Sequence, residues 1–463
     1  MNIDELSHIS LRDLQDALSK REVSPVELVD LTLDQTDAVN DQINALYDVR
    51  HEEARQEAKA SEGRYLKGNP ICPFDGIPVT IKDSVNAVGM KWFHGTNIHG
   101  NGVVAKKDSP PAARLKEAGT IIIGKGAMPD FGLSGSGVSG SHGIVRNPWG
   151  LEWNTGGSSA GGAASLAAGI GMMSLGSDIA GSVRLPAAHC GLAALKPTQG
   201  AIPHAPASTV RSAGPITRSA ADLSAWTMLL NKPHEDDRYS VPLRDEHNGD
   251  RPVIGATVDF GFGPDVEPAV LKCFETVKSV LSGLFEPIKE ITTKAGFDAY
   301  LPIDDSLKIK GWQEYQSAEE HMRCKTPSQL YEWFKEAEHW TPTKLASVND
   351  GIEKGVAFCR ELFADVEVLL TPVMPVVNFP AAHRGIDPSM PLRHSTFTAL
   401  FNQSGNPAVS ICGGFDDRGL PIGIQLVGKR FDDLRLMNIA AKLEDALGVM
   451  GEGRKNWPTA PVA

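Results

Sequence analysis

A serine between closely spaced glycines is the first feature of the sequence that could do chemistry. Residues 157–161 (GSSAG) match the pattern G-x-S-x-G. This pattern marks the nucleophilic serine of α/β-hydrolases when a strand directly precedes it. That serine would be Ser159, but residues 147–155 before it look like a loop. An α/β-hydrolase esterase that uses Ser159 therefore remains an alternative only.

A second pattern, Gly119-x4-Gly124-Lys125, resembles a phosphate-binding P-loop. A P-loop continues with a serine or threonine that binds magnesium, whereas Gly126 follows the lysine here. Three isoleucines at 121–123 also occupy the part of the pattern where backbone should surround a phosphate. The pattern therefore does not predict nucleotide binding.

Three longer motifs follow one another along the chain. They are residues 76–83 (GIPVTIKD), 156–162 (GGSSAGG) and 176–186 (GSDIAGSVRLP). Together they resemble the amidase signature family. The resemblance covers nearly the whole chain and is weakest at 232–345. It implies an α/β fold in which a large mixed central sheet is covered on both faces by helices.

The resemblance also implies a Ser–cis-Ser–Lys triad. Ser182 is then the nucleophile, Ser158 the relay and Lys82 the base, and the Gly157–Ser158 peptide bond is cis. The residue types suit these roles, because a serine nucleophile needs a base within hydrogen-bond reach and a hydroxyl both donates and accepts. Lysine acts as a base only when neutral, a state that burial favours. Lys82 ends an apolar segment, so we expect it to be buried.

The residues before Ser182 are expected to stabilise the tetrahedral intermediate, because successive backbone N–H groups at a tight turn can converge on an oxyanion. Ala180 stands where a glycine is usual, so its backbone must adopt a conformation open to L-residues. The residues expected around this loop to brace it by hydrogen bonds are Ser177, Asp178 and Arg184. The predicted oxyanion hole comprises Ile179, Ala180, Gly181 and Ser182.

The substrate pocket is less well defined by the resemblance. Residues 131–137 (FGLSGSG) align with the family segment that lines the acyl pocket, and Phe131, Leu133 and Ser134 are the predicted pocket residues. Six aromatic residues between 312 and 340 indicate either a funnel for an apolar or aryl substrate or the packing of a helical region. They are Trp312, Tyr315, Tyr331, Trp333, Phe334 and Trp340.

Composition limits the possible partners and cofactors. A net charge of −12 disfavours binding to nucleic acid or to anionic lipid. No apolar run is long enough to span a membrane, and the N-terminus does not resemble a signal peptide, so we expect a cytoplasmic protein. The six cysteines form no CxxC pair, which predicts reduced, buried thiols and no zinc site. No metal or organic cofactor is implied.

The predicted elements fit the expected fold. Residues 1–65 look helical, and Ser24-Pro25 is a typical start for one of these helices. Predicted strands include 77–81, 120–123, 366–370, 408–412 and 421–427, and predicted helices include 109–118 and 432–447. We expect one amidase domain over residues 1–463, with a variable helical region at 232–345 that lines the substrate funnel.

The sequence therefore predicts an amidase that cleaves the C–N bond of a small-molecule amide through a Ser182 acyl-enzyme. An apolar or aryl amide, an anilide or a carbamate is the expected substrate, and the protein is expected to act as a monomer or homodimer. The other alternative is a glutamine-dependent amidotransferase-type subunit. Such a subunit would need partner subunits and a charged glutamine pocket, whose residues are not recognisable here.

Overall fold

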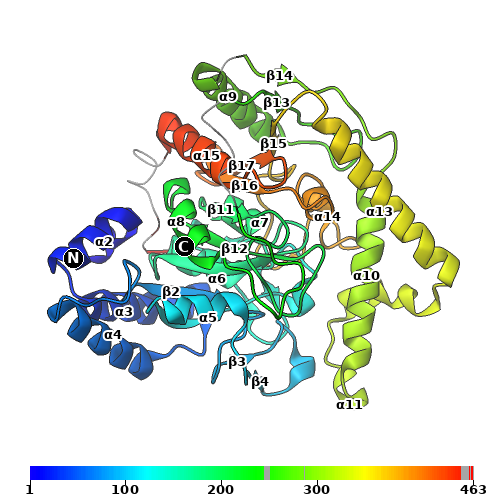
Figure 1. Cartoon of the computed structure of the whole chain (residues 1–463). Coiled ribbons are helices and arrows are strands. Elements are labelled where there is room, and N and C mark those ends of the chain that lie inside the picture. The colour runs from blue at the N-terminus through cyan, green and yellow to red at the C-terminus, as the bar shows by residue number, and fades with distance from the viewer. Residues whose placement is uncertain (244–250, 286, 450–457, 459, 462–463) are drawn as a thin grey trace.

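Eleven strands form one mixed sheet through the middle of the molecule (Figure 1). The computed structural model describes residues 1–243, 251–285, 287–449, 458 and 460–461. Strand order is β1-β5-β2-β10-β12-β11-β16-β17-β15-β13-β14. The strands are β1 (Leu46–Tyr47), β2 (Pro78–Lys82), β5 (Ile121–Gly126), β10 (Met173–Asp178), β11 (Ala193–Lys196), β12 (Ser212–Thr217), β13 (Ile254–Ala256), β14 (Lys289–Glu290), β15 (Val368–Pro372), β16 (Ala408–Phe415) and β17 (Pro421–Gly428).

Helices cover both faces of this sheet, as the sequence predicts. Successive side chains of a strand point to opposite faces. In β11, Ala193 and Leu195 pack with α8, α9 and α15, whereas Ala194 packs with α6 and α7. These helices are α6 (Ala160–Ala167), α7 (Arg184–His189), α8 (Ala220–Leu230), α9 (Pro268–Phe285) and α15 (Asp433–Leu447).

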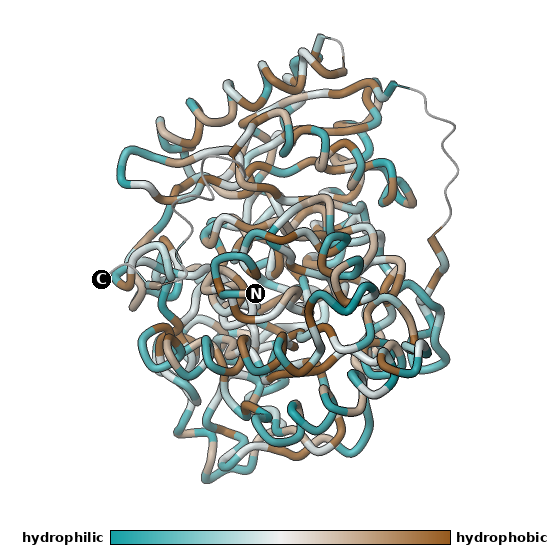
Figure 2. Tube along the Cα trace, turned by 90° about the vertical axis from the view of Figure 1, so that its left-hand side faces the viewer, coloured by the Kyte–Doolittle hydropathy of each residue, from teal (hydrophilic) through white to brown (hydrophobic). Residues whose placement is uncertain are grey.

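The N-terminal part is helical apart from β1, and its helices pack on the end of the sheet that carries β5 (Figure 1). Ser24 caps α3 as predicted: its Oγ accepts a hydrogen bond from Glu27 N at 3.1 Å. In Figure 2 the helices at the bottom of the view carry both hydrophilic and hydrophobic residues along their length. This mixture is expected for helices with one face on the sheet. The helices of this N-terminal part are α1 (Ile3–His8), α2 (Leu11–Lys20), α3 (Pro25–Ile43) and α4 (His51–Leu66). A later helix, α5 (Pro110–Glu117), also packs against β5.

A group of helices borders the other side of the molecule, at the right of Figure 1. Five of the six aromatic residues predicted there, all except Trp340, pack in one cluster. The Phe334 ring also contacts Phe131, with 6.1 Å between ring centroids. The helices are α10 (Tyr300–Ser317), α11 (Glu320–Arg323), α12 (Ser328–Phe334), α13 (Pro342–Leu362) and α14 (Leu400–Gln403).

Short hairpins and 3-10 turns complete the fold, and one of them corrects a prediction. Residues 150–154, which look like a loop in sequence, form a strand paired with residues 146–147 outside the main sheet. The remaining elements are β3 (Lys91–Trp92), β4 (Val103–Val104), β6 (Val138–Ser139), β7 (Gly143–Ile144), β8 (Arg146–Asn147), β9 (Gly150–Asn154), η1 (Asn97–His99), η2 (Asp130–Gly132), η3 (Lys335–His339) and η4 (Arg393–Ser395).

Several predictions from composition can be compared with the described residues. None of the described helices has the length and hydrophobicity needed to cross a membrane. All six cysteines are free, and four are buried, but Cys72 is partly exposed and Cys324 is exposed, so burial was wrong for these two. Across the described ranges, no cluster of three or more His, Cys, Asp or Glu residues could hold a metal ion.

Candidate active site

Lys82 lies at the end of β2, a central strand that is buried along its whole length. Its side chain is 2% exposed, and Nζ donates hydrogen bonds to Ser158 Oγ at 2.8 Å and to Ser177 Oγ at 3.2 Å. Burial lowers the pKa of Lys82 to about 7, although the negative charge of Asp178 partly opposes this shift. This shift favours the neutral form of Lys82, which is able to accept a proton.

Neighbouring strands hold Lys82 in this position. β2 pairs in parallel with β10, which places Ser177 beside Lys82, and the Ser177 carbonyl accepts a further hydrogen bond from Nζ at 3.1 Å. Asp83 does not pair with Lys82; its carboxylate accepts from the backbone N–H groups of Phe93 and Gly95 at 2.8 and 2.7 Å. The predicted supporting residue Ser177 therefore contacts Lys82 directly.

The lysine of the P-loop-like pattern also has a structural position. Lys125 lies inside strand β5 and is 1% exposed. Its Nζ donates to the carbonyls of Asp83 and Val85, the turn that follows Lys82. The rejection of a phosphate-binding loop is consistent with this placement in a buried strand.

The two serine segments meet beside Lys82. The Gly157–Ser158 peptide bond is cis, as the resemblance predicts. Ser159 N donates to the Ser182 carbonyl at 3.1 Å, which joins the segment before α6 to the loop between β10 and α7. Ser182 is 1% exposed, and its Oγ has no hydrogen-bond partner in the described part of the chain. The candidate nucleophile is thus a buried hydroxyl that no structural hydrogen bond occupies.

The loop before Ser182 is held by a buried ion pair. Asp178 and Arg184 are both 0% exposed, and Asp178 Oδ2 accepts from Arg184 Nε at 3.0 Å. Burial alone would raise the pKa of Asp178, but the Arg184 charge and its hydrogen bonds hold that pKa well below its usual range. Asn402 Nδ2 donates to the same carboxylate at 2.9 Å. Asp178 and Arg184 therefore brace the loop, as expected.

The Asp178 carboxylate also affects which backbone N–H groups of the predicted oxyanion hole are available. Gly181 N donates to Asp178 Oδ1 at 2.7 Å, so this member of the four predicted donors has a hydrogen-bond partner within the protein. The backbone N–H groups of Ile179, Ala180 and Ser182 donate no hydrogen bond to any described residue. Gly181 has φ +126°, whereas Ala180 does not have a positive φ, so the alanine fits where it stands.

A small pocket, partly open to solvent, lies over Lys82 and Ser158. Phe131 and Leu133 line it as predicted, but Ser134 does not. Ser134 is 0% exposed, and its Oγ is 2.7 Å from both Ser136 Oγ and the Arg384 carbonyl. Ser134 thus lies outside this lining, and its side chain holds the loop by hydrogen bonds.

The pocket also contains residues that sequence reasoning missed. Met128, Gly132 and Ile179 extend its apolar wall, and Ser84, His94, Arg211 and Lys310 add polar groups. His94 Nδ1 contacts Glu314 Oε1 of α10. No hydrogen bond joins His94 to Ser158, Ser159 or Ser182 within the described chain, so a histidine triad is not formed. Among the described residues of the 232–345 region, Lys310 lines the pocket. Residues 244–250 and 286 of that region lie outside the described residues.

The alternative nucleophile Ser159 is also buried and precedes α6. Its Oγ donates to the Ser177 carbonyl at 3.4 Å, whereas Ser182 Oγ is not engaged by a described residue; neither serine is among the residues that line the pocket. The strand before it belongs to the separate hairpin of β8 and β9 rather than to the main sheet. This context differs from the strand-to-helix turn of an α/β-hydrolase.

Comparison with known proteins agrees with the fold and the motifs. The Amidase family model matches residues 27–300 and 353–437. A glutamyl-tRNA(Gln) amidotransferase subunit from Geobacter metallireducens is 30% identical over 483 residues, covering 96% of this chain and 98% of that protein. The corresponding subunit from Heliobacterium modesticaldum is 28% identical over 476 residues, covering 94% and 96%.

Solved structures show the same fold. A bacterial aryl acylamidase of the amidase signature family has a TM-score of 0.88 at 22% identity, covering 98% of this chain and 99% of that one. A 6-aminohexanoate cyclic dimer hydrolase has a TM-score of 0.86 at 24% identity, covering 96% and 98%. The chain therefore belongs to the amidase signature family and is an enzyme that acts on amide C–N bonds.

Proposed function

We propose that this protein hydrolyses a small-molecule amide through an acyl-enzyme formed on Ser182. The observation that carries the proposal is the 2.8 Å hydrogen bond between Ser158 Oγ and a buried Lys82 whose pKa is lowered to about 7. A lysine in this state can accept a proton near neutral pH, and the Ser158 hydroxyl can pass one to it.

The proposed reaction extends this relay to Ser182, whose Oγ makes no hydrogen bond with a described residue in the free protein. Ser182 Oγ attacks the carbonyl carbon while its proton moves to Ser158 Oγ and the Ser158 proton moves to Lys82 Nζ. The tetrahedral intermediate collapses when the relay returns a proton to the leaving nitrogen, which breaks the C–N bond. Water then attacks the acyl-enzyme by the same proton path, releasing the carboxylic acid and restoring Ser182.

The negative oxygen of the intermediate is stabilised by the loop before the nucleophile. The free N–H groups of Ile179, Ala180 and Ser182 supply the donors, and the Asp178–Arg184 pair fixes their direction in advance. Donors that are already oriented lower the barrier because they need no rearrangement when the charge forms.

The apolar side of the pocket supports an amide with an apolar or aryl part, such as an anilide, an aryl amide or a carbamate. Phe131, Leu133 and Met128 supply this wall, and the Phe334 ring supports Phe131 from behind. The aromatic cluster between 312 and 340 thus acts by packing, since none of its rings lines the pocket. We expect a cytoplasmic monomer or homodimer.

An amidotransferase-type subunit is the second candidate, because the curated relatives at 28–30% identity are named as such subunits. A hydrolysis screen of the purified single chain distinguishes the two functions. The proposal predicts turnover of aliphatic amides, anilides or carbamates without any partner, whereas an amidotransferase-type subunit predicts glutamine as the preferred amide.

A fluorophosphonate probe tests which serine is the nucleophile. Wild-type protein and Ser159→Ala are expected to be labelled, whereas Ser182→Ala is expected to lose labelling completely because the attacking oxygen is gone. In-gel fluorescence at matched protein concentration measures the result. Labelling that persists in Ser182→Ala, or that disappears in Ser159→Ala, contradicts the assignment and favours the α/β-hydrolase alternative.

A further inference from the structure

We propose that Arg211 and Lys310 form an anion-binding subsite in the active-site pocket, so that the substrate is an amide bearing a carboxylate group. The inference rests on the proposed function, because the subsite belongs to the same pocket as Lys82 and Ser158. It adds the chemical class of the substrate to the reaction.

The two cations come from distant parts of the chain. Arg211 directly precedes β12, and Lys310 lies in α10 of the helical group at the right of Figure 1. Both line the pocket together with Lys82 and Ser158. The same lining contains the imidazole of His94, but it contains no aspartate or glutamate. The pocket over Lys82 and Ser158 is therefore lined by basic side chains without an acidic residue among them.

Neither cation is neutralised by an ion pair in the described part of the chain. Arg211 Nη2 donates to the Pro206 carbonyl at 2.9 Å, while Arg211 Nε is buried and has no hydrogen-bond partner. Lys310 Nζ makes no hydrogen bond or ion pair with a described residue. Lys308, two positions earlier on α10, shows the contrast: it pairs with Asp304 at 3.3 Å and Glu336 at 2.5 Å. Lys310 thus lacks the internal partners that its neighbour has.

The acidic residues nearest to this pair already have other partners. Glu314 lies one turn further along α10 and contacts His94. Asp237 accepts hydrogen bonds from the backbone N–H groups of His204 and Tyr239 at 2.9 and 3.0 Å. Burial, and then the charge of Arg211, lower the pKa of Lys310 to about 8. Two like charges held together in a pocket are stabilised by an anion placed between them.

A carboxylate is the anion that this site fits best. A guanidinium binds carboxylate oxygens through paired N–H donors, and a lysine ammonium adds a point charge. The pocket is small, and Met128, Phe131 and Leu133 supply an apolar part of its lining. A short hydrocarbon with an amide at one end and a carboxylate at the other satisfies both sides.

Isosteric substrate pairs test the proposal. Succinamate and 4-methylpentanamide carry a carboxylate or an isopropyl group of similar shape on the acyl side, and N-butyryl-β-alanine and N-(3-methylbutyl)butyramide differ in the same way on the amine side. We expect the charged member of at least one pair to have the higher kcat/KM, by about 10- to 100-fold, as for a hydrogen bond to a charged group. Release of ammonia or of the primary amine is the readout, and the favoured pair identifies the side that the subsite binds.

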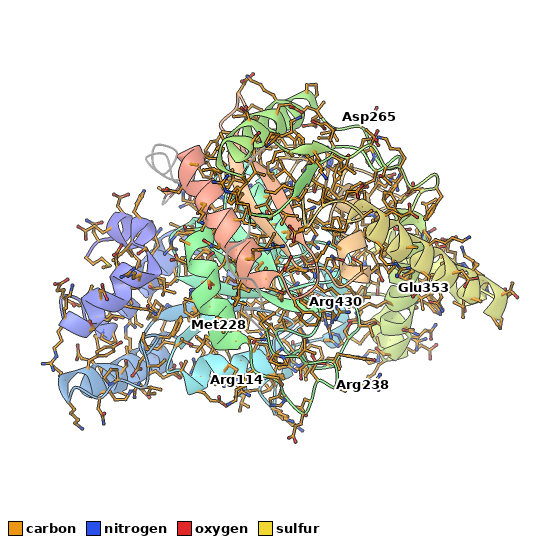
Figure 3. All side chains as sticks on the ribbon, turned by 45° about the horizontal axis from the view of Figure 1, so that its top comes forward. Arg114, Met228, Arg238, Asp265, Glu353 and Arg430 are labelled. Carbon is orange, nitrogen blue, oxygen red and sulfur yellow. The ribbon has the colours of Figure 1, made fainter. Side chains whose placement is uncertain are left out.

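Substitutions of the two cations should remove this preference. Lys310→Met and Arg211→Gln are expected to lower the charged-to-neutral ratio by about 10- to 100-fold, mainly through KM. Lys310→Met is the safer variant because Nζ makes no internal hydrogen bond with a described residue. Lys354→Met is the matched control: this lysine is exposed on α13 beside Glu353, which is labelled in Figure 3. It should leave the ratio unchanged.

The outcomes separate the subsite from the reaction. Equal kcat/KM within both pairs, or a preference that survives both Lys310→Met and Arg211→Gln, overturns the subsite while Ser182-dependent hydrolysis stands. If wild-type protein hydrolyses no amide, the proposed function fails instead, and calorimetric binding to Ser182→Ala still tests the subsite. Succinamate or N-butyryl-β-alanine should then bind more tightly than its neutral isostere, and Lys310→Met should abolish the difference; equal binding overturns the inference.

Discussion

Replacing Lys82 with methionine is expected to lower kcat by about 10²- to 10⁴-fold, the usual contribution of a general base. Lys82 Nζ is the group next to the Ser158 hydroxyl, and methionine has similar length but accepts no proton. Release of the amine from the best substrate of the screen measures the effect. Near-ultraviolet circular dichroism checks that the variant keeps its folded core.

The same variant should change the pH dependence. Only neutral Lys82 accepts a proton, so wild-type kcat/KM should rise with pH and level off above an apparent pKa of about 7. The rise follows the direction of the shift, because burial lowers the pKa of this lysine from its ordinary value near 10.5. The residual rate of Lys82→Met should show no such rise.

Two other residues of the pocket serve as controls for this assignment. Lys310 has a pKa of about 8, and His94 also lines the pocket and carries a group that could accept a proton. The rise near pH 7 should persist in Lys310→Met and in His94→Gln, whatever their absolute rates. A rise that persists in Lys82→Met and disappears in His94→Gln would show that the histidine is the base.

Much of the site could be predicted because it lies in continuous motifs. Lys82 ends a run of apolar residues that forms a buried strand, so its burial follows from the local sequence. Ser158 and Ser182 lie in glycine-rich turns that flank helices α6 and α7, where the backbone alone brings the segments together. The prediction of a mixed sheet with helices on both faces was also confirmed. Individual strands and helices can be recognised from the local sequence pattern of each segment.

The rest of the site depends on contacts between distant segments. Lys310 and the pairing of His94 with Glu314 depend on how α10 packs over the pocket, whereas Arg211 comes from the segment before β12; no local pattern indicates that these residues meet. Ser134 illustrates a different limit. It lies between two pocket segments in sequence, but its side chain turns to the Arg384 carbonyl, 250 positions away. The direction of such a side chain is determined by tertiary hydrogen bonds, which the local sequence does not reveal.

Replacing Asp178 with asparagine is expected to lower both stability and activity. The change leaves the Arg184 charge buried without its acidic partner, which should reduce the free energy of unfolding by about 3–5 kcal/mol. It also weakens the hydrogen bonds that orient the loop of Ile179, Ala180 and Ser182. Loss of one oriented oxyanion donor typically costs about 10²- to 10³-fold in kcat, so kcat should fall by up to that amount. Thermal melting and steady-state kinetics measure the two effects separately.

The stability effect has a defined pH dependence. Because Arg184 lowers the pKa of Asp178 in the folded protein, the ion pair stabilises the fold at pH values above the ordinary carboxyl range. This contribution is lost as pH falls below about 4 toward the lowered pKa. The difference in melting temperature between wild type and Asp178→Asn should therefore be constant from about pH 8 to pH 5. A difference that vanishes already at neutral pH would contradict a charged Asp178.

A double variant separates stability from catalysis. In Asp178→Asn with Arg184→Met the unpaired charge is removed, so part of the lost stability should return. The rate should not return, because the carboxylate that holds Gly181 N at 2.7 Å and Val183 N at 3.2 Å is still absent. Thr398→Val is the milder comparison, since it keeps the ion pair and removes the Thr398 Oγ1 hydrogen bonds to the Ala180 carbonyl at 2.7 Å and to the Ser395 carbonyl at 3.1 Å. If kcat recovered together with stability in the double variant, Asp178 would be a structural residue alone, and the orientation of the oxyanion loop would have to come from elsewhere.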